Sequence, residues 1–325
     1  MRYLLMFLLC GLPMLAGAVE FDETTRSLPL GRVMQVLEDP SGSVTLADAR
    51  SVALASRYTT HDKDTLNAGY SRSAFWLKVD LHYLPKDPQA LRTWLLELAY
   101  PPLDHLELYV PDDTGAYRLA GRTGDALPFA SREIRQNNYL FNVDFKAGEQ
   151  KTLYLRLQSE GSIQAPLTLW SSTAYLEDQP LRLYVLGLIY GVLLGMLVYN
   201  LFIYLSVRDT SYLYYILYIA SFGMYQLSVN GAAVEYFWPD NPWWANAATP
   251  FLIGASALFG SLFARSFLHT ALYSRWLDRL LRVLVGTGAV VMLLSLMTSY
   301  ALALRLATAL ALIFTVTIFV AGIKA

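Results

Sequence analysis

Two acidic clusters hold the side chains best suited to bind a metal ion. They are HDKD at 61–64 and PDDTG at 111–115, and carboxylate oxygens are the ligands that calcium prefers. Neither cluster has the graded spacing of a known calcium loop, so solvated turns are the favoured interpretation and calcium is the open alternative. The four histidines show no ligand spacing: His61, His82, His105 and His269. We predict no metal site and no other cofactor.

Motifs of the common enzyme classes are not found in the sequence. We see no glycine-rich phosphate loop, nucleophile elbow or pair of catalytic carboxylates in a convincing context. The sequence has no stripe of basic residues that would indicate a nucleic-acid partner. The prediction is a chain without an enzyme active site.

The N-terminus has the pattern of a secretory signal. Arg2 precedes the apolar run LLMFLLCGLPML, and AGA at 16–18 fits a cleavage site with small residues. We predict a signal peptide over 1–18. Cys10, the only cysteine, lies inside it, so the mature domain must hold together by packing alone.

The charges divide the chain into two parts. Residues 19–180 carry 16 Lys and Arg against 22 Asp and Glu, a balance of −6, whereas residues 181–325 carry 8 against 4, a balance of +4. Since 55% of all residues are hydrophobic, the second part is too apolar for an ordinary water-soluble domain. The division predicts a soluble domain at 19–180 and a membrane domain at 181–325.

Alternating apolar residues predict strands in the first part. The segments are separated by turn residues and show no helices between them, which favours an antiparallel all-β sandwich or jelly roll. Thr45 and Asp48 resemble a capping box and predict one short helix. The predicted strands are 74–84, 93–100, 104–110, 116–121, 139–145, 152–159 and 166–170.

The second part predicts an α-helical, polytopic membrane domain. Each of its apolar segments is close to the length that crosses a bilayer. They are 184–205, 212–229, 250–268, 283–300 and 306–323. Export of residues 19–180 would place six Lys and Arg on the inner side and two on the outer side, in agreement with the positive-inside rule.

Small and polar residues in the membrane part predict helix contacts. Gly187, Gly191 and Gly195 share one helix face and predict close packing, within the bundle in preference to dimerisation. Asn200 predicts a hydrogen bond between helices. The loop 230–246 contains three tryptophans, which predicts an anchor at the outer membrane interface or a lid that touches the β domain.

Several motifs together resemble the bacterial seven-transmembrane receptors with diverse intracellular signalling modules. They run in the order of that family through almost the whole mature chain. The motifs are SRSAFWLKVDL (71–81), LELAYPPLDHLELYVP (96–111), GDALPFASREI (124–134), LYLRLQSEGS (153–162), GVLLGMLVYNLFIYLSVRDTSYLYY (191–215), Gly231 with YFWP (236–239), and FARSFL (263–268).

The resemblance implies a periplasmic jelly-roll sensor domain of the second extracellular type, similar to carbohydrate-binding modules. It also implies seven helices and a cytoplasmic output module, commonly a histidine kinase or a diguanylate cyclase. The sequence departs from the pattern because it stops after five spans. We therefore expect a fragment of a longer receptor or a truncated gene product.

The resemblance also points to residues of the β domain that could hold a sugar. Aromatic rings would stack on the sugar and polar side chains would bind its hydroxyl groups. The aromatic candidates are Trp76, Trp94, Tyr100 and Tyr109, with Trp76 more in keeping with a core position. The polar candidates are Arg72, Asp104, Asp125 and Arg132, where Asp104 could equally cap a turn and Asp125 could form a structural ion pair with Arg132.

The resulting prediction is the sensor and transmembrane half of a signal-transduction receptor in the bacterial inner membrane. A small, carbohydrate-like periplasmic ligand would act through the helix bundle, or between two protomers of a homodimer, on a cytoplasmic module outside this chain. The alternative is a truncated membrane partner that modulates a full-length receptor. A transporter is disfavoured because no charge lies in the middle of a span.

Overall fold

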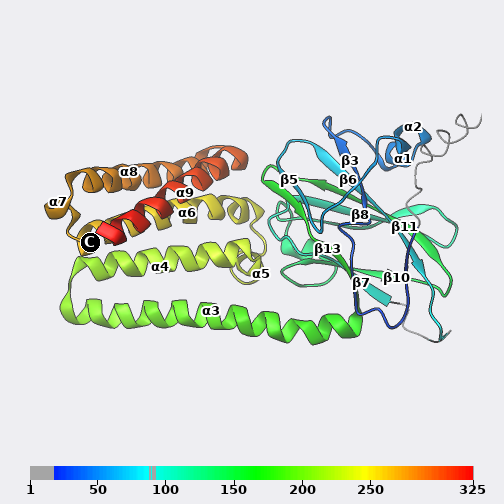
Figure 1. Ribbon diagram of the computed structural model, residues 1–325, viewed down its shortest axis with the longest axis horizontal. Helices are drawn as coiled ribbons and strands as arrows, with labels where there is room; N and C mark the ends of the chain where they lie inside the picture. The colour runs from blue at the N-terminus through cyan, green and yellow to red at the C-terminus, as the bar shows by residue number, and fades with distance from the viewer. Residues whose placement is uncertain (1–17, 88, 90–92, 325) are drawn as a thin grey trace, which may run out of the picture.

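The computed structural model describes residues 18–87, 89 and 93–324, so residues 1–17 of the predicted signal peptide lie outside it. The chain forms two parts that meet end to end, a β sandwich and a bundle of long helices (Figure 1). The predicted all-β domain followed by an α-helical domain is confirmed.

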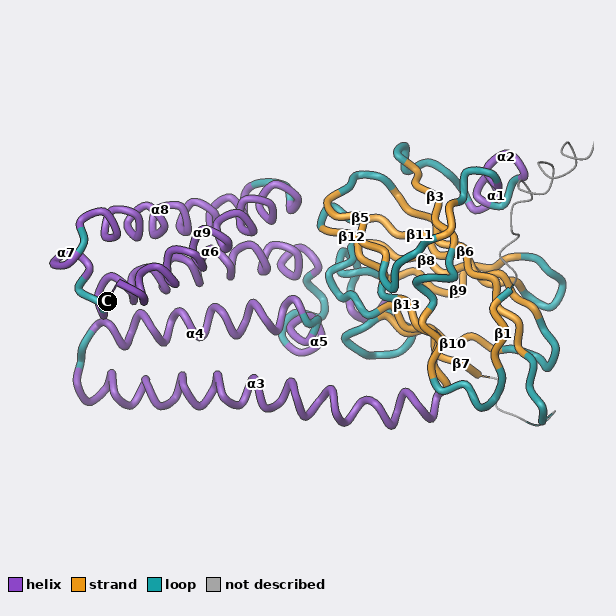
Figure 2. Tube along the Cα trace, in the orientation of Figure 1, coloured by secondary structure: helices purple, strands orange, loops and turns teal. Residues whose placement is uncertain are grey.

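Two sheets form the sandwich, and a separate antiparallel pair of strands lies beside them (Figure 2). All pairs are antiparallel except β1 with β6. The larger sheet contains β1 (Val19–Phe21), β3 (Gln35–Asp39), β4 (Thr59–Thr60), β6 (Ala74–Tyr83), β8 (His105–Pro111), β9 (Tyr117–Thr123) and β11 (Gln150–Gln158). The second contains β2 (Ser27–Pro29), β7 (Thr93–Leu98), β10 (Tyr139–Asp144) and β13 (Leu167–Ser171), and the pair is β5 (Leu66–Tyr70) with β12 (Ser162–Ala165).

The sandwich core is built from the alternating positions of the strands. Side chains of one face of β6 and β11 are almost completely removed from solvent, and so are those of β7. An aromatic group closes one end of the core, where the Phe21 ring lies 4.9 Å from Trp94 and 5.1 Å from both Tyr83 and Phe145. Burial of this apolar surface stabilises the domain without a disulfide.

Two short helices cover an outer face of the larger sheet. They are α1 (Leu46–Ala49) and α2 (Val52–Ala55). Thr45 accepts a hydrogen bond from the Asp48 amide, and the Asp48 carboxylate accepts one from the Thr45 amide, which is the predicted capping box.

The second part consists of long helices that run side by side (Figure 1). They are α3 (Ser172–Val207), α4 (Thr210–Val229), α6 (Pro242–Phe267), α8 (Arg275–Met297) and α9 (Tyr300–Lys324), with short α5 (Ala232–Tyr236) and α7 (Thr270–Tyr273) in the connections. In the described part of the chain, four helices are long and apolar enough to cross a membrane: α3, α6, α8 and α9. The remaining predicted span, 212–229 in α4, is not among them, because the five tyrosines of α4 lower its hydropathy.

Helix boundaries differ from the predicted spans. α3 begins at Ser172, directly after β13, so the sandwich passes into the bundle without a loop and before residue 181. α8 ends at Met297 and α9 begins at Tyr300, so the predicted span 283–300 crosses the connection between two helices. The residues on both sides of this short turn are apolar, so the hydropathy of the sequence does not reveal the turn.

The predicted glycine contact is not formed with any of the described helices. Gly187, Gly191 and Gly195 are exposed, and a Cβ placed at each would meet no atom within 4 Å in the described structure. The glycine face of α3 therefore points away from α4. Asn200 also differs from its prediction, since its Nδ2 donates to the carbonyl of Met196, one turn earlier in the same helix, at 2.7 Å.

The end of the bundle far from the sandwich is fixed by a buried carboxylate. Asp278, in the first turn of α8, is 4% exposed and accepts from Arg265 Nε at 2.9 Å and from Arg282 Nη2 at 2.8 Å. Removing either arginine would leave part of this charge uncompensated, so the three residues hold α6 against α8.

We predict that the sandwich folds without the bundle. Its main core consists only of residues between Phe21 and Leu169. Residues 19–180 expressed alone should give the circular dichroism spectrum of a β protein and unfold cooperatively on heating. A mostly helical spectrum would contradict the prediction.

Candidate functional site between the sandwich and the bundle

The sandwich contacts the bundle through the loop between α4 and α6. The amide of Phe129, in the short 3₁₀ helix η1 (Phe129–Ser131), donates to the Pro239 carbonyl at 2.9 Å. Asn137 Nδ2 donates to the carbonyl of Asn230 at 3.0 Å. Phe129 also packs in an apolar cluster with residues of the loop and of α6, namely Val234, Trp238 and Ala245. The tryptophan-rich loop thus touches the β domain.

Glycine is required where this loop meets the sandwich. Gly231 has a φ of +76°, and a Cβ there would lie 2.9 Å from both the Asn137 carbonyl oxygen and Pro101 Cβ. Only a residue without a side chain permits this approach.

A cavity of about 860 Å³ lies between the two parts. The sandwich contributes Arg72, Asp104, His105 and Glu160 to its walls, together with small polar side chains, and the bundle contributes Trp243, Asn246, Tyr300 and Arg305. Charged groups of both signs, hydroxyl groups and an exposed indole therefore surround one space. Such walls suit a small polar ligand with donors and acceptors.

Two buried aspartates stand at the sandwich side of this cavity. Asp104 lies just before β8 and Asp125 just after β9, and they are 5% and 7% exposed. Their segments are joined by backbone hydrogen bonds, from Asp125 N to the Leu103 carbonyl at 2.9 Å and from Ala126 N to the Asp104 carbonyl at 3.3 Å. The backbone thus holds the two carboxyl groups beside each other.

The surroundings of Asp125 favour its protonated form. Burial and the neighbouring Asp104 raise the pKa of Asp125 well above its ordinary value, and Arg132 opposes this shift only in part. Asp104 Oδ2 accepts from the Glu160 amide at 2.6 Å. Oδ1 of each aspartate has no hydrogen-bond partner in the described structure.

Arg132 fixes the loop that follows η1. The side chain is 6% exposed, and its Nη1 donates to the carbonyls of Gln136 and Asn137, both at 2.6 Å. The guanidinium also lies over the rings of Phe129 and Tyr139, at 4.7 and 4.6 Å from their centroids. Arg132 therefore stabilises the segment that contacts the bundle, and its charge acts on Asp125.

The eight predicted ligand residues divide into two groups. Arg72 and Asp104 line the cavity, and Asp125 lies beside Asp104, within range of the Arg132 charge and of the partly buried Tyr100. The structure thus brings five of the eight to one region. The sequence signal for them was residue type within the resembling motifs SRSAFWLKVDL, LELAYPPLDHLELYVP and GDALPFASREI.

The other three, all aromatic, lie away from the cavity. Trp76 is fully buried under α1 and α2 and stacks on Tyr109, with 5.7 Å between the ring centroids. Trp94 is fully buried in the main core. Neither tryptophan has a free face for a sugar, so as stacking platforms these two predictions are wrong. Alternation within a strand had already favoured a core position for Trp76.

Sequence reasoning missed the bundle side of the cavity. Arg305 Cζ lies 5.4 Å from the centroid of the Tyr70 ring, and the Tyr70 hydroxyl is 3.2 Å from Thr308 Oγ1, so α9 contacts β5 directly. Tyr300 packs on Gly161 of the sandwich, where an added Cβ would lie 3.2 Å from Tyr300 Cε1. These pairs are far apart in the sequence, and no local pattern could have linked them.

A second junction lies at the root of α3. Glu97 of β7 is 2% exposed and accepts from Trp170 Nε1 at 2.9 Å, from Asn138 Nδ2 at 2.7 Å and from Arg182 Nη1 at 3.1 Å. Arg182 also pairs with Asp178 at 2.6 Å. One carboxylate thus ties β7, β13 and the first turns of α3 together.

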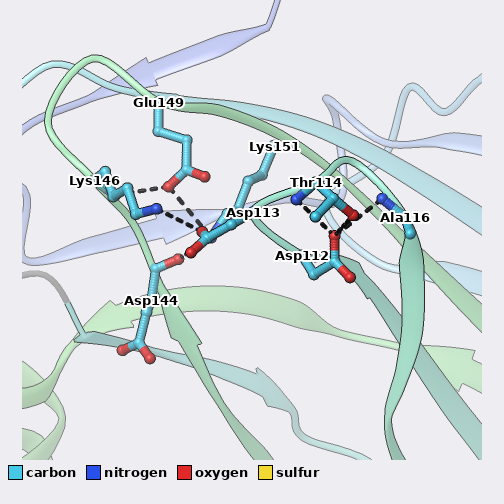
Figure 3. A network of polar contacts seen from close by, with 8 residues as sticks. All are labelled: Asp112, Asp113, Thr114, Ala116, Asp144, Lys146, Glu149 and Lys151. Carbon is cyan, nitrogen blue, oxygen red and sulfur yellow. Dashed lines mark hydrogen bonds and ion pairs between the residues drawn. The ribbon is translucent and has the colours of Figure 1, made fainter.

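The PDDTG turn satisfies its own carboxylates. Figure 3 shows that Asp112 accepts from the amide and hydroxyl of Thr114, at 2.8 and 2.6 Å, and from the Ala116 amide at 3.0 Å, while Asp113 pairs with Lys146. The hydrogen bonds from Thr114 lower the pKa of Asp112, and the hydrogen bond and charge of Lys146 lower the pKa of Asp113. Within residues 18–87, 89 and 93–324, no three His, Cys, Asp or Glu side chains gather as metal ligands would.

Comparisons with known families agree with both parts of the structure. A family model described as 7TMR-DISM extracellular 2 matches residues 31–171, and one described as 7TM diverse intracellular signalling matches residues 182–325. No curated protein matches the chain. The first match covers the sandwich from β3 to β13, and the second covers the helices from within α3 onward. The chain therefore belongs to the seven-transmembrane receptors with diverse intracellular signalling modules, as an extracellular sensor domain joined to its membrane region.

Proposed function

We propose that the chain is the input half of a bacterial signal-transduction receptor in the inner membrane, with the sandwich in the periplasm. A small, hydroxyl-rich, carbohydrate-like ligand binds in the cavity and acts on the bundle. The observation that carries the proposal is that side chains of both parts line one space of about 860 Å³. A ligand that contacts both parts can favour one arrangement of them over another.

The relay follows from the two junctions. A ligand shifts the equilibrium between two arrangements of the parts only by its difference in affinity for them. A ligand held by Arg72 of the sandwich and Arg305 of the bundle has such a difference, because movement of the parts changes the distance between its two binding groups. Movement of the sandwich reaches α6 through Phe129 and reaches α3 through Glu97. The helices then carry it to the inner side, where an output module outside this chain responds.

Partners of the chain follow from the same proposal. The chain acts without an enzyme activity of its own, and a cytoplasmic signalling module or a second protomer receives the change. The exposed apolar surface of α3 supports contact with lipid or with another helix. The alternative is a membrane partner that tunes a full-length receptor through the same surfaces.

We predict that the bridging arginines determine ligand affinity. The full chain in lipid nanodiscs is screened on a glycan array, and the dissociation constant of the best glycan is measured for Arg72→Ala and Arg305→Ala. Loss of one charged hydrogen bond, about 1.5 kcal/mol, lowers affinity about tenfold. Arg118→Ala, at an exposed position of β9 remote from the cavity, is the matched control.

Two results would contradict the proposal. One is that no glycan is retained by the full chain, which would remove the ligand class. The other is binding that Arg72→Ala and Arg305→Ala leave at the affinity of the Arg118→Ala control, which would place the ligand elsewhere.

A further inference from the structure

The two buried aspartates beside the cavity form an unusual pair. Both are more than nine-tenths buried, and the backbone hydrogen bonds between their segments hold them beside each other. Oδ1 of Asp104 and Oδ1 of Asp125 are buried acceptors without a donor in the described part of the chain. Two such oxygens side by side are costly, because each has lost water and the charges repel.

One proton shared between the carboxyl groups removes both problems. It gives each orphaned oxygen a partner, and it leaves the pair with a single negative charge. Arg132, whose Nε has no acceptor among the described residues, supplies the opposite charge that acts on Asp125. The burial that raises the pKa of Asp125 acts in the same direction.

Other groups from every neighbouring element face this pair and set its field. From the sandwich these are Tyr100, Arg132 and the fully buried Tyr139, whose hydroxyl donates to the Pro101 and Leu103 carbonyls, and from α9 it is Tyr300. Tyr70 acts in turn on Tyr100 and Tyr300. His105, Glu160, Arg72 and Arg305 share the cavity wall with Asp104, and Glu235 of α5 acts on Arg132. Arg132 is the cation whose charge opposes the rise in the pKa of Asp125.

We propose that Asp104 and Asp125 form a proton-binding site that couples external pH to the contact between sandwich and bundle. The ligand is the proton itself, so the inference goes beyond the proposed function and needs no organic ligand. Loss of the proton leaves two negative charges against one arginine. Their repulsion drives apart the segments 103–105 and 124–126.

The second segment leads directly to the bundle contact. Five residues after Gly124 stands Phe129, whose amide binds the Pro239 carbonyl and whose ring packs on the loop between α4 and α6. Arg132 follows and binds the Asn137 carbonyl, next to the bond from Asn137 to Asn230. Displacement at Asp125 therefore reaches both contacts, and protonation restores them.

The sign of the pH dependence follows from linkage. The ordinary pKa of the aspartate is 3.8, and that of Asp125 in the folded chain is higher. Between these values the folded chain holds a proton that the unfolded chain has released. This contribution to stability is complete below pH 3.8 and is lost as the pH rises through the folded pKa.

The test uses the full chain in nanodiscs without added ligand. Infrared difference spectra report the protonated carboxyl group, and energy transfer between dyes at Lys63→Cys and Tyr273→Cys reports the arrangement of the two parts. Both readouts should show a transition with a midpoint above pH 3.8. Asp125→Asn mimics the protonated acid, because its amide can donate to Asp104, and it should lose the infrared band and hold the low-pH transfer efficiency at every pH.

Two further variants complete the experiment. Asp113→Asn, an exposed acid in the turn beyond β8, should keep both transitions of the wild-type chain. Asp104→Asn should lower the midpoint of the infrared transition, because it removes the charge beside Asp125. Two results would overturn the proposal. One is that Asp125→Asn keeps the wild-type energy-transfer transition. The other is that the infrared spectra of the wild-type chain above pH 3.8 contain no protonated carboxyl band that disappears in Asp125→Asn.

Discussion

Gly124→Ala should lower the free energy of unfolding of the sandwich by about 4 kcal/mol, which combines backbone strain of roughly 1–3 kcal/mol with a similar cost of overpacking. Gly124 has a φ of +149°, where an L residue is strained. A Cβ there would also lie 1.8 Å from the Asp104 carbonyl oxygen. That oxygen accepts the Ala126 amide, so the backbone around it has little freedom to retreat.

The control separates strain from crowding. Gly115 has a φ of +80°, but a Cβ there meets no described atom within 4 Å. Gly115→Ala should therefore cost about 1 kcal/mol, from the backbone alone. Urea unfolding of residues 19–180, followed by tryptophan fluorescence, measures both variants. Equal losses for the two would show that the approach of Gly124 to Asp104 contributes nothing.

The strands could be predicted from the sequence because their period is local. Alternation places Leu77, Val79 and Leu81 on one face of β6, and the structure buries all three completely. The capping box at Thr45 is equally local and is also found. Pairing of β6 with β11 joins strands far apart in the chain, and only the general rule for antiparallel sandwiches could anticipate it.

The candidate site could be predicted only in part, because it is assembled from two domains. Arg72 and Asp104 belong to the sandwich, and their residue type within the motifs of the resemblance marked them. Asn246 and Tyr300 belong to helices whose sequence reports only apolar character and length. Trp76 and Trp94 show the opposite error, since a large aromatic residue serves a core as well as a sugar.

The glycines of α3 show a third kind of limit. Their spacing defines a face of the helix, and the structure places that face away from the other described helices. A periodic pattern fixes which residues share a face, but the direction of that face depends on which helix packs where. In α3 that direction is set at its root, by the contacts that join it to the sandwich.

Glu97→Ala should give the second large effect, a loss of about 2–4 kcal/mol, because the Trp170 and Asn138 donors lose their buried acceptor. The change leaves Trp170, Asn138 and Arg182 without their shared acceptor. Arg182 is partly exposed and keeps Asp178, so the Trp170 and Asn138 contacts account for most of the loss. Thermal unfolding of the full chain in nanodiscs, followed by the β-sheet signal in circular dichroism, measures it.

Two matched variants test whether Glu97 acts as a joint and not merely as a buried charge. Glu97→Gln keeps the size and one acceptor oxygen, so it should cost about 1–2 kcal/mol. Asp178→Ala removes only the surface partner of Arg182 and should cost less than about 1 kcal/mol. If Asp178→Ala destabilised the chain as much as Glu97→Ala, α3 would be held by its surface pair. The expected order instead means that the buried Glu97 carboxylate, and not the surface pair, holds α3 to β7 and β13.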